Sequence, residues 1–294
     1  MTAGLRWNLA HGRSVCLDRP AVMAIVNVTP DSFADGGRHL AVADAVGAVM
    51  RAVRDGAAII DIGGESTRPG ADAVPEAEQI ARVVPVIQAC RSAGGDLAEI
   101  PMSVDTTRAG VARAALEAGA DAVNDVSGGT DDPGMVPLVA AAACGLVIMH
   151  RRVAPRGDTF SDRYQREPEY EGGVVAFVQR WLLERRRVAM RAGVDASRIV
   201  LDPGLGFGKS VEQNLALIEA TEALAAHAPV VSALSRKSFV GRVSLGRDST
   251  PEERLPGTLA LSARHLARGA RVFRVHDVAE HVAALGAAWG GTAG

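Results

Sequence analysis

One pattern recurs along the chain and limits the folds open to it: a glycine, then a short apolar run, then polar residues. Clear copies occur at 55–64, 118–129 and 268–278, and a longer version occupies 192–204. Such a glycine can end a helix in a left-handed conformation, and an unbroken apolar run suits a strand buried on both faces. The pattern therefore predicts parallel strands that alternate with helices.

Eight such runs can be placed, and amphipathic helical stretches separate them. The runs are 22–29, 59–64, 101–106, 122–127, 145–150, 199–204, 230–236 and 272–277. Eight strand–helix units predict one α/β domain, a single (β/α)8 TIM barrel over 1–294, with residues 1–20 as a lead-in and 286–294 as a frayed tail. On periodicity alone, a doubly wound open sheet remains the alternative.

Composition excludes several classes of protein. The chain is 48% hydrophobic, and its net charge of −2 gives no general attraction for nucleic acid or anionic membrane. No apolar stretch reaches the roughly 18 residues of a membrane span, and the N-terminus lacks the apolar segment of a signal peptide. Cys16, Cys90 and Cys144 are widely spaced, which predicts small buried residues in a reducing cytoplasm rather than disulfides or a zinc site.

Polar residues stand at the carboxyl ends of all eight runs, which in a barrel form the catalytic face. They are Asn27, Thr29, Asp31, Asp61, Glu65, Asp105, Asn124, Asp125, His150, Asp202, Arg236, Lys237, Arg274, His276 and Asp277. This set predicts a site for an anionic, polar ligand, although Asp61, Asp125 or Asp277 could instead cap the following helix. The loops at 29–39 and 63–75 are interpreted as mobile lids, and 151–173 as a surface loop.

The segment VLDPGLGFGKS at 200–210 looks like a nucleotide-binding loop because glycines precede its Lys-Ser pair. A P-loop requires a glycine where this chain has Pro203, and the evenly spaced glycines do not match the dinucleotide fingerprint. We therefore interpret the segment as a strand end that presents Asp202 to another ligand, with Lys209 at the surface or at the start of a helix.

Six phrases, in order along almost the whole chain, resemble the dihydropteroate synthase family, the folate-pathway enzymes that sulfonamides inhibit. They are MAIVNVTPDSFADGG (23–37), GAAIIDIGGESTRPGA (56–71), SVDTTRAGVARAALEAGADAVNDVSGG (103–129), LDPGLGFGKS (201–210), SRKSFVGR (235–242) and RVHDV (274–278). The resemblance implies a cytoplasmic, homodimeric TIM-barrel transferase assisted by Mg²⁺. The reaction it implies joins (7,8-dihydropterin-6-yl)methyl diphosphate to 4-aminobenzoate by an SN1-like step, giving 7,8-dihydropteroate and diphosphate.

The same resemblance assigns roles to particular residues. The residues it implies for pterin binding are Asp105, Asn124, Met149, Asp202 and Lys237. Diphosphate binding falls to Asn27, Thr67, Arg68, Arg274 and His276, with Asn27 also contacting Mg²⁺. The 4-aminobenzoate site comprises Phe33, Thr67, Arg68, Pro69, Gly206, Phe207, Lys237 and Ser238. The catalytic residues are Asp105, Lys237 and Arg274.

These residue types suit that reaction. A pterin ring presents a row of N–H donors and acceptors, which carboxylate and amide side chains can match. Loss of diphosphate leaves a cation on the pterin, so donors should meet the leaving group and carboxylates the ring. No general base is evident, and capture of the cation by a held amine is largely a matter of positioning.

The chain departs from the family pattern at two places, and two other functions remain as alternatives. Ala233 replaces a glycine of many members, and RRVAPRGD at 151–158 replaces the commoner turn, so His150 is interpreted as structural. A corrinoid-dependent methyltransferase would share the pterin acids but would not need the diphosphate-binding Arg-x-His. A non-catalytic pterin-binding barrel would not need Arg68, Lys237, Arg274 and His276.

Overall fold

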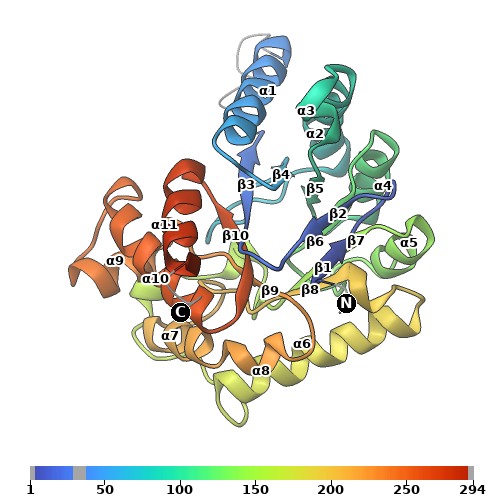
Figure 1. The fold of residues 1–294 in the computed structure, drawn as a ribbon. Coiled ribbons are helices and arrows are strands. Elements are labelled where there is room, and N and C mark those ends of the chain that lie inside the picture. Colours follow the sequence, from blue (N-terminus) through green and yellow to red (C-terminus); the bar gives the residue numbers. More distant parts are fainter. Residues whose placement is uncertain (1–3, 29–37, 291–294) are drawn as a thin grey trace.

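The computed structural model describes residues 4–28 and 38–290, in which eight parallel strands close a barrel (Figure 1). Around the barrel the strands are β10 (Ala270–Val275), β3 (Ala21–Asn27), β4 (Ile59–Gly63), β5 (Met102–Asp105), β6 (Ala122–Asp125), β7 (Gly145–Met149), β8 (Ile199–Asp202) and β9 (Val230–Ser232). Because β10 pairs with both β3 and β9, the sheet has no edge and the open doubly wound alternative is excluded. The predicted (β/α)8 barrel is confirmed.

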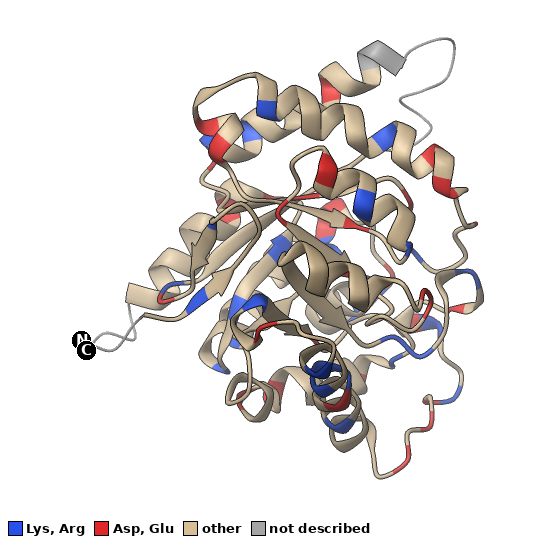
Figure 2. Cartoon of the chain, turned by 90° about the vertical axis from the view of Figure 1, so that its right-hand side faces the viewer, with Lys and Arg blue, Asp and Glu red and all other residues tan. Residues whose placement is uncertain are grey.

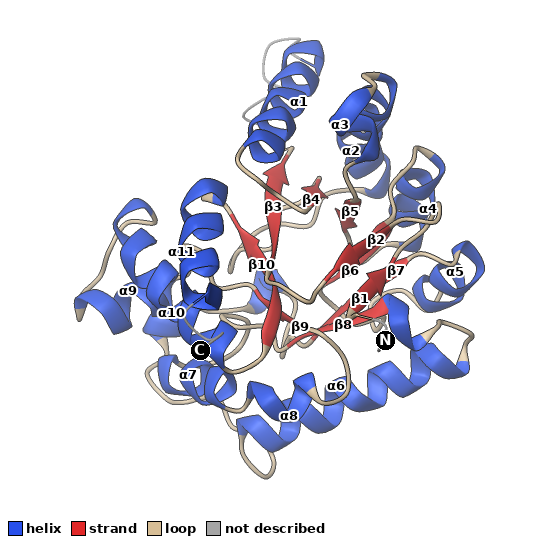
Figure 3. Ribbon diagram, viewed as in Figure 1, coloured by secondary structure: helices blue, strands red, loops and turns tan. Residues whose placement is uncertain are grey.

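Helices surround the ring of strands (Figure 3). They are α1 (Arg38–Arg54), α2 (Glu76–Ser92), α3 (Gly95–Glu99), α4 (Ala109–Glu117), α5 (Met135–Ala142), α6 (Val174–Arg191), α7 (Val211–Glu219), α8 (Thr221–Ala225), α9 (Ser238–Leu245), α10 (Leu255–Ala267) and α11 (Val278–Gly290). A frayed tail was expected from residue 286, but α11 continues to Gly290. In its last turn the Trp289 ring lies 4.9 Å from the Arg271 guanidinium, a distance at which the two attract each other.

Alternation along the strands separates the two sides of the barrel wall. Outward residues such as Ile60 and Val123 pack in one large cluster with the helices. Inward residues such as Ile59 and Ala122 form a second cluster inside the barrel. Two positions further along a strand the side chain again points inward. By this alternation, six side chains point into the barrel at the carboxyl ends of the strands, and all but one of them are polar: Asp61, Asp105, Asn124, Met149, Asp202 and Arg274.

A small antiparallel hairpin closes the amino end of the barrel. It consists of β1 (Arg6–Asn8) and β2 (Ser14–Cys16), within the stretch interpreted only as a lead-in. Trp7 and Leu17 are fully buried and belong to the inner cluster of strand residues. The Trp7 indole Nε1 donates to the Arg198 carbonyl at 2.8 Å. Substrates must therefore reach the barrel from its opposite end.

The hairpin also explains why the prediction for the cysteines was wrong at one position. Cys90 and Cys144 are buried, and burial raises the pKa of the Cys90 thiol to about 11 and that of Cys144 to about 12. Cys16, however, is exposed. Strand alternation turns its neighbour Val15 into the core and Cys16 outward.

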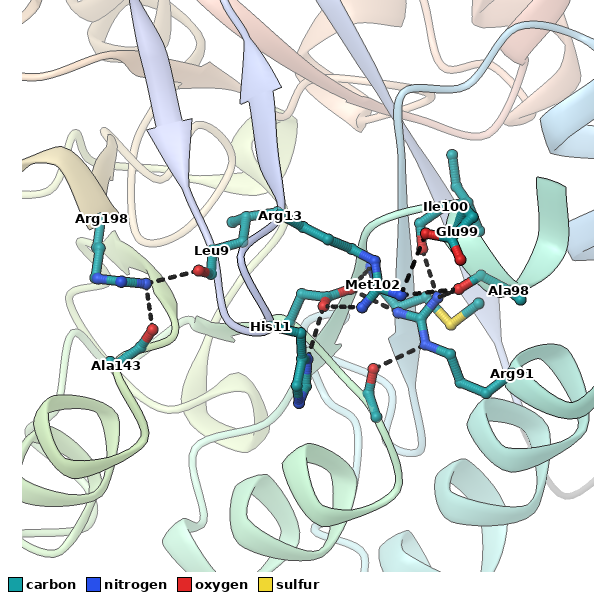
Figure 4. A network of polar contacts seen from close by, with 12 residues as sticks. Leu9, His11, Arg13, Arg91, Ala98, Glu99, Ile100, Met102, Ala143 and Arg198 are labelled. Atoms are coloured by element: carbon teal, nitrogen blue, oxygen red, sulfur yellow. Dashed lines mark hydrogen bonds and ion pairs between the residues drawn. The ribbon is translucent and has the colours of Figure 1, made fainter. Parts of the chain in front are cut away.

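Asp121 anchors the hairpin to the barrel. Its buried carboxylate accepts from Arg13 Nη1 at 3.0 Å and from Arg91 Nη2 at 2.6 Å, and His11 Nδ1 lies 3.0 Å away. Figure 4 shows His11, Arg13 and Arg91 converging at this point. The backbone N–H of Met102 donates to the same carboxylate at 2.9 Å. Hairpin, α2 and β5 are thus joined through one buried charge at the end away from the predicted site.

Charge is distributed over the chain rather than gathered in one region. Figure 2 shows acidic and basic residues mixed among the helices and loops, in line with a net charge of −2. Within residues 4–28 and 38–290, no helix combines the length and apolar character that a membrane span needs.

Candidate active site

A buried cluster of carboxylates around Arg274 forms the centre of the site. Asp61 is fully buried; its Oδ2 accepts from Arg274 Nε at 2.6 Å and from Asn124 Nδ2 at 3.0 Å. Ser103 Oγ donates to the other Asp61 oxygen at 2.5 Å. Arg274 Nη2 donates to Asp105 Oδ2 at 2.7 Å. Asp61 therefore links Asn124 to Arg274, and Arg274 in turn binds Asp105, so three predicted residues belong to one cluster.

The roles predicted for residues did not include Asp61. It was placed only on the polar rim, with helix capping as an alternative. The signal that identifies it is strand alternation, because Asp61 lies two residues after inward-facing Ile59. By contrast, Asp125 faces the other way and accepts from Ser127 N at 2.8 Å and Gly129 N at 2.7 Å, so it holds the loop after β6 and does not cap the following helix α5, whose first turn accepts no side-chain cap.

The charges in this cluster strongly affect one another. Burial opposes the charge on Arg274, but the Asp61 and Asp105 carboxylates hold its pKa above the usual arginine value. Burial raises the pKa of Asp105 to about 7, and Arg274 only partly offsets this because Asp61 adds a second negative charge. The site therefore holds a permanent cation beside a carboxyl group that can exist in both forms near neutral pH.

Asp202 stands across the barrel at the end of β8. Its Oδ1 accepts from the Gly204 backbone N–H at 2.7 Å, and burial raises its pKa while the Lys237 charge lowers it. Lys237 Nζ donates to the Leu205 carbonyl and lies 4.4 Å from the Phe207 ring centroid. Burial lowers the pKa of Lys237 to about 8.

Gly206 makes this arrangement possible. Its φ of +84° is a left-handed conformation, and a Cβ there would lie 2.8 Å from Lys237 Cδ. A side chain would therefore strain the backbone and push Lys237 away. The adjacent apolar wall consists of Val126, Met149 and Phe207, which pack together at the rim. Ser238, also predicted, begins α9 directly after Lys237.

His276 is fixed by Ser235, a second residue outside the predicted set. The backbone N–H of His276 donates to Ser235 Oγ at 3.2 Å, and His276 Nδ1 lies 3.1 Å from the same oxygen. Burial, together with Arg274 and Arg236, lowers the pKa of His276 to about 4. At neutral pH the imidazole is uncharged and hydrogen-bonded on its Nδ1 side. The carboxylate of the neighbouring Asp277 is already paired with an arginine, because its Oδ2 accepts from Arg236 Nε at 2.9 Å.

The remaining predicted residues lie on or near the loops at the mouth. Asn27 ends β3 opposite Gly63, where an added Cβ would be 3.6 Å from both Asn27 Oδ1 and Asp105 Cβ. The loop of Thr67, Arg68 and Pro69 leaves the end of β4. Phe33 and most of the first predicted lid lie outside the described residues.

The loops after β4 and β7 lie against each other. The backbone N–H of Gly70 donates to the Pro155 carbonyl at 2.8 Å, and Arg156 Nε is 3.7 Å from Asp72 Oδ1. Between them is a cavity of about 120 Å³ whose lining includes Thr67 and Asp105. The predicted surface loop at 151–173 therefore forms part of the wall next to the site.

Lys209 does not lie where its sequence context predicts. It was placed at the surface or at a helix start, but its side chain is fully buried. Helix α7 is instead capped by Ser210, whose hydroxyl accepts from Gln213 N in a capping box. His150, interpreted as structural, is also buried and lies against Lys209, with 3.1 Å between His150 Nδ1 and Lys209 Nζ.

The described residues contain no group of three or more His, Cys, Asp or Glu that could hold a metal ion. The amide oxygen of Asn27 lies at the end of β3, near Asp105. Magnesium usually keeps several waters and takes one or two protein oxygens together with substrate phosphates. A single amide oxygen fits an ion that arrives with a diphosphate, and does not fit an ion held by the protein alone.

Comparisons with known proteins agree with this geometry. A family model described as "Pterin binding enzyme" matches residues 23–276. The dihydropteroate synthase of Mycobacterium leprae is 45% identical over 90% of both chains, and that of Escherichia coli is 38% identical over 94% of this chain and 93% of its own. A solved dihydropteroate synthase from Xanthomonas albilineans superposes with a TM-score of 0.87 at 42% identity, covering 99% of this chain and 100% of the other. The chain belongs to the dihydropteroate synthase family, the pterin-binding transferases of folate biosynthesis.

Proposed function

We propose that the chain joins (7,8-dihydropterin-6-yl)methyl diphosphate to 4-aminobenzoate, giving 7,8-dihydropteroate and diphosphate. The main support is the polar cluster of Asp61, Asp105, Asn124 and Arg274 inside a barrel open at one end. Xanthomonas albilineans relatives solved with 4-aminobenzoic acid and with 7,8-dihydropteroate support the same substrates and product. The relatives are named as synthases, which favours this reaction over corrinoid-dependent methyl transfer.

In this proposal the pterin ring lies between Asp105 and Asp202, with Asn124 and Met149 beside it. The two carboxylates accept the ring N–H groups, and Lys237 donates to the ring carbonyl. These carboxylates also stabilise the positive charge that develops on the pterin when diphosphate leaves. Asp105 can keep its 2.7 Å bond from Arg274 while it accepts from the pterin, because a carboxylate has two oxygens and about four acceptor sites.

The diphosphate lies at the mouth, against Arg274, His276, Asn27, Thr67 and Arg68. Arg274 can meet the charge that develops on the leaving group, because its pKa is held high. Neutral His276 is fixed through Nδ1 and presents Nε2 as a donor. Mg²⁺ is the proposed cofactor, held by the Asn27 amide and the diphosphate itself, and it would supply further positive charge to the leaving group.

The 4-aminobenzoate lies between the apolar walls of Phe33 and Phe207, with Thr67, Arg68 and Pro69 above it. Gly206 leaves room beside Lys237, and Ser238 with the amino end of α9 receives the carboxylate. The arylamine is then held next to the pterin methylene, and positioning replaces general-base catalysis. Asp105, Lys237 and Arg274 are the catalytic residues of this scheme.

The deciding experiment measures diphosphate release by the purified chain with the pterin diphosphate and Mg²⁺, with and without 4-aminobenzoate. Release that depends on 4-aminobenzoate and yields dihydropteroate is the expected result. Asp105→Ala and Arg274→Ala should abolish it, and unchanged turnover in both variants would overturn the residue assignments. Tight pterin binding without release would instead indicate a non-catalytic pterin-binding barrel.

Three further properties are proposed along with the reaction. A Yersinia pestis relative solved as a sulfonamide drug complex supports inhibition by sulfonamides, to be measured against 4-aminobenzoate as competitor. Unpaired cysteines support a cytoplasmic location. A homodimer through the outer helices is expected from the family resemblance, and light scattering would measure its mass.

A further inference from the structure

The ammonium of Lys209 is buried, and none of the carboxylates in the described part of the chain forms an ion pair with it. Its Nζ donates to the carbonyl oxygens of Gly204 and Phe207, each at 2.8 Å. The His150 carbonyl lies 3.3 Å away and His150 Nδ1 3.1 Å away. A buried charge is costly unless it is hydrogen-bonded, and lysine is almost never fully buried without partners. Four acceptors around three N–H donors meet this requirement.

These acceptors belong to two separate parts of the chain. Gly204 and Phe207 lie in the segment 203–208 between β8 and α7, whereas His150 directly follows β7. The ammonium therefore fastens the segment 203–208 to the end of the neighbouring strand. His150 is suited to accept a hydrogen bond at Nδ1, because burial and the Lys209 charge lower its pKa to about 2. Its ring is in turn packed edge-on against Trp181, with 5.0 Å between centroids.

The segment has little regular structure of its own to hold it. Gly204, Gly206 and Gly208 have φ values of +67°, +84° and +67°, so the backbone alternates through left-handed positions. A Cβ at Gly204 would lie 1.8 Å from the His150 carbonyl oxygen, which shows how closely the two backbones approach. Further tethers to the same segment are Tyr170 Oη to the Gly208 carbonyl at 2.7 Å and Gly206 N to Asn214 Oδ1 at 2.7 Å.

Both ends of this segment face the proposed substrates. Gly204 N donates to Asp202 Oδ1, and Phe207 forms the wall below Lys237. We propose that Lys209 is a positioning residue, whose buried ammonium holds the segment 203–208 against His150 and so sets the places of Asp202 and Phe207. This inference rests on the proposed function, because Asp202 and Phe207 act on substrate only if the pterin and 4-aminobenzoate bind there.

The test compares Lys209→Met with the control Thr221→Val, both of which remove buried hydrogen bonds. Thr221 Oγ1 lies 2.9 Å from His265 Nε2 and is bonded to the Leu217 carbonyl at 3.1 Å, remote from the segment 203–208. Thr221→Val should lower the melting temperature and leave both KM values near those of the parent chain. Lys209→Met should raise the KM for 4-aminobenzoate and the Kd for pterin, lowering kcat/KM about 100-fold, the effect of a misplacement of about 1 Å.

Chemical rescue separates positioning from general loss of stability. In Lys209→Ala, n-propylammonium should restore the KM for 4-aminobenzoate, whereas tetramethylammonium at the same ionic strength has no N–H group and should not. If the Lys209 variants do not fold, His150→Leu decides the question, because it removes one acceptor and should raise the same KM less strongly. Unchanged KM values in the variants that fold, with the parent chain active, would overturn this inference alone. An inactive parent chain would overturn the proposed function first.

Discussion

Asp61 connects residues that are proposed to bind different parts of one substrate. It touches Asn124 on the pterin side and Arg274 on the diphosphate side. Asp61→Asn removes its charge and brings an amide N–H₂ against the donors of both. We expect kcat/KM to fall by about 10²-fold, because the cation that should meet the leaving group loses its orientation. Steady-state kinetics with varied pterin diphosphate would measure this.

Asp121→Asn is the matched control for that change. Asp121 is also a fully buried carboxylate bonded to arginine, but it lies at the closed end of the barrel. Its replacement should lower the free energy of unfolding and leave kcat/KM close to the parent value. Equal kinetic losses in the two variants would mean that Asp61 acts only on stability.

Gly206→Ala tests how closely Lys237 must approach the loop. The new methyl group would meet Lys237 Cδ at 2.8 Å, in addition to about 1–2 kcal/mol of left-handed strain. Gly172→Ala carries comparable strain, at φ +77°, with nothing within 4 Å of the added atom. Only Gly206→Ala should raise the KM for 4-aminobenzoate, as measured by initial rates. A similar rise in both would attribute the effect to backbone strain.

The sequence was informative about single residues wherever strand alternation applied to them. Asp105, Asn124, Asp202 and Arg274 all lie at the carboxyl ends of strands, as predicted. Lys209 was misplaced because its ammonium turns back onto the carbonyl groups of its own loop, Gly204 and Phe207, and onto His150, 59 positions earlier. Local pattern carries no information about such a distant acceptor, so a lysine beside a serine suggested a surface position.

Among the secondary-structure elements, the β1–β2 hairpin contributes to stability at a distance from the chemistry. Trp7 is fully buried, and Trp7→Ala removes its packing and its hydrogen bond to Arg198. We expect a loss of about 3–5 kcal/mol in the free energy of unfolding, with both KM values unchanged below the unfolding transition. Urea denaturation and initial rates on the same preparation would measure the two effects. A kinetic change in the fully folded variant would contradict the separation of the two ends.

The apolar runs predicted the strands themselves, but the predicted end positions of the strands were less accurate. The run 230–236 contains a strand only over Val230–Ser232, because Ala233 to Lys237 leave the sheet to form the loop that carries Lys237. The hairpin was missed altogether. Strands of three residues are too short to show alternation, and only burial against the closed barrel makes Trp7 and Val15 recognisable as inward positions.

For the whole chain, two buried histidines determine part of the response to acid. Burial lowers the pKa of His150 to about 2 and that of His265 to about 3, from 6.5. Below pH 6.5 the unfolded chain therefore binds more protons at these positions than the folded chain does. Each histidine should reduce the free energy of unfolding by up to about 1.4 kcal/mol per pH unit as the pH falls toward 4.

Urea titrations at several values between pH 7 and 4 would measure that slope. Asp105 has the opposite effect on the free energy of unfolding as the pH falls, because its raised pKa lets the folded chain bind a proton more readily than the unfolded chain does. Comparison with His265→Gln isolates the contribution of one histidine, and the variant should show a shallower slope. Identical slopes would show that His265 does not titrate as its burial implies.

The position of the hairpin in the chain also has a consequence for synthesis. Trp7 leaves the ribosome well before its hydrogen-bond partner Arg198, which comes 191 residues later. At about 5–20 residues per second, the nascent hairpin waits roughly 10–40 s for that partner. During this interval the indole and its apolar neighbours have no barrel to enter. Synthesis of β10, which pairs with both β3 and β9, therefore times the closure of the barrel.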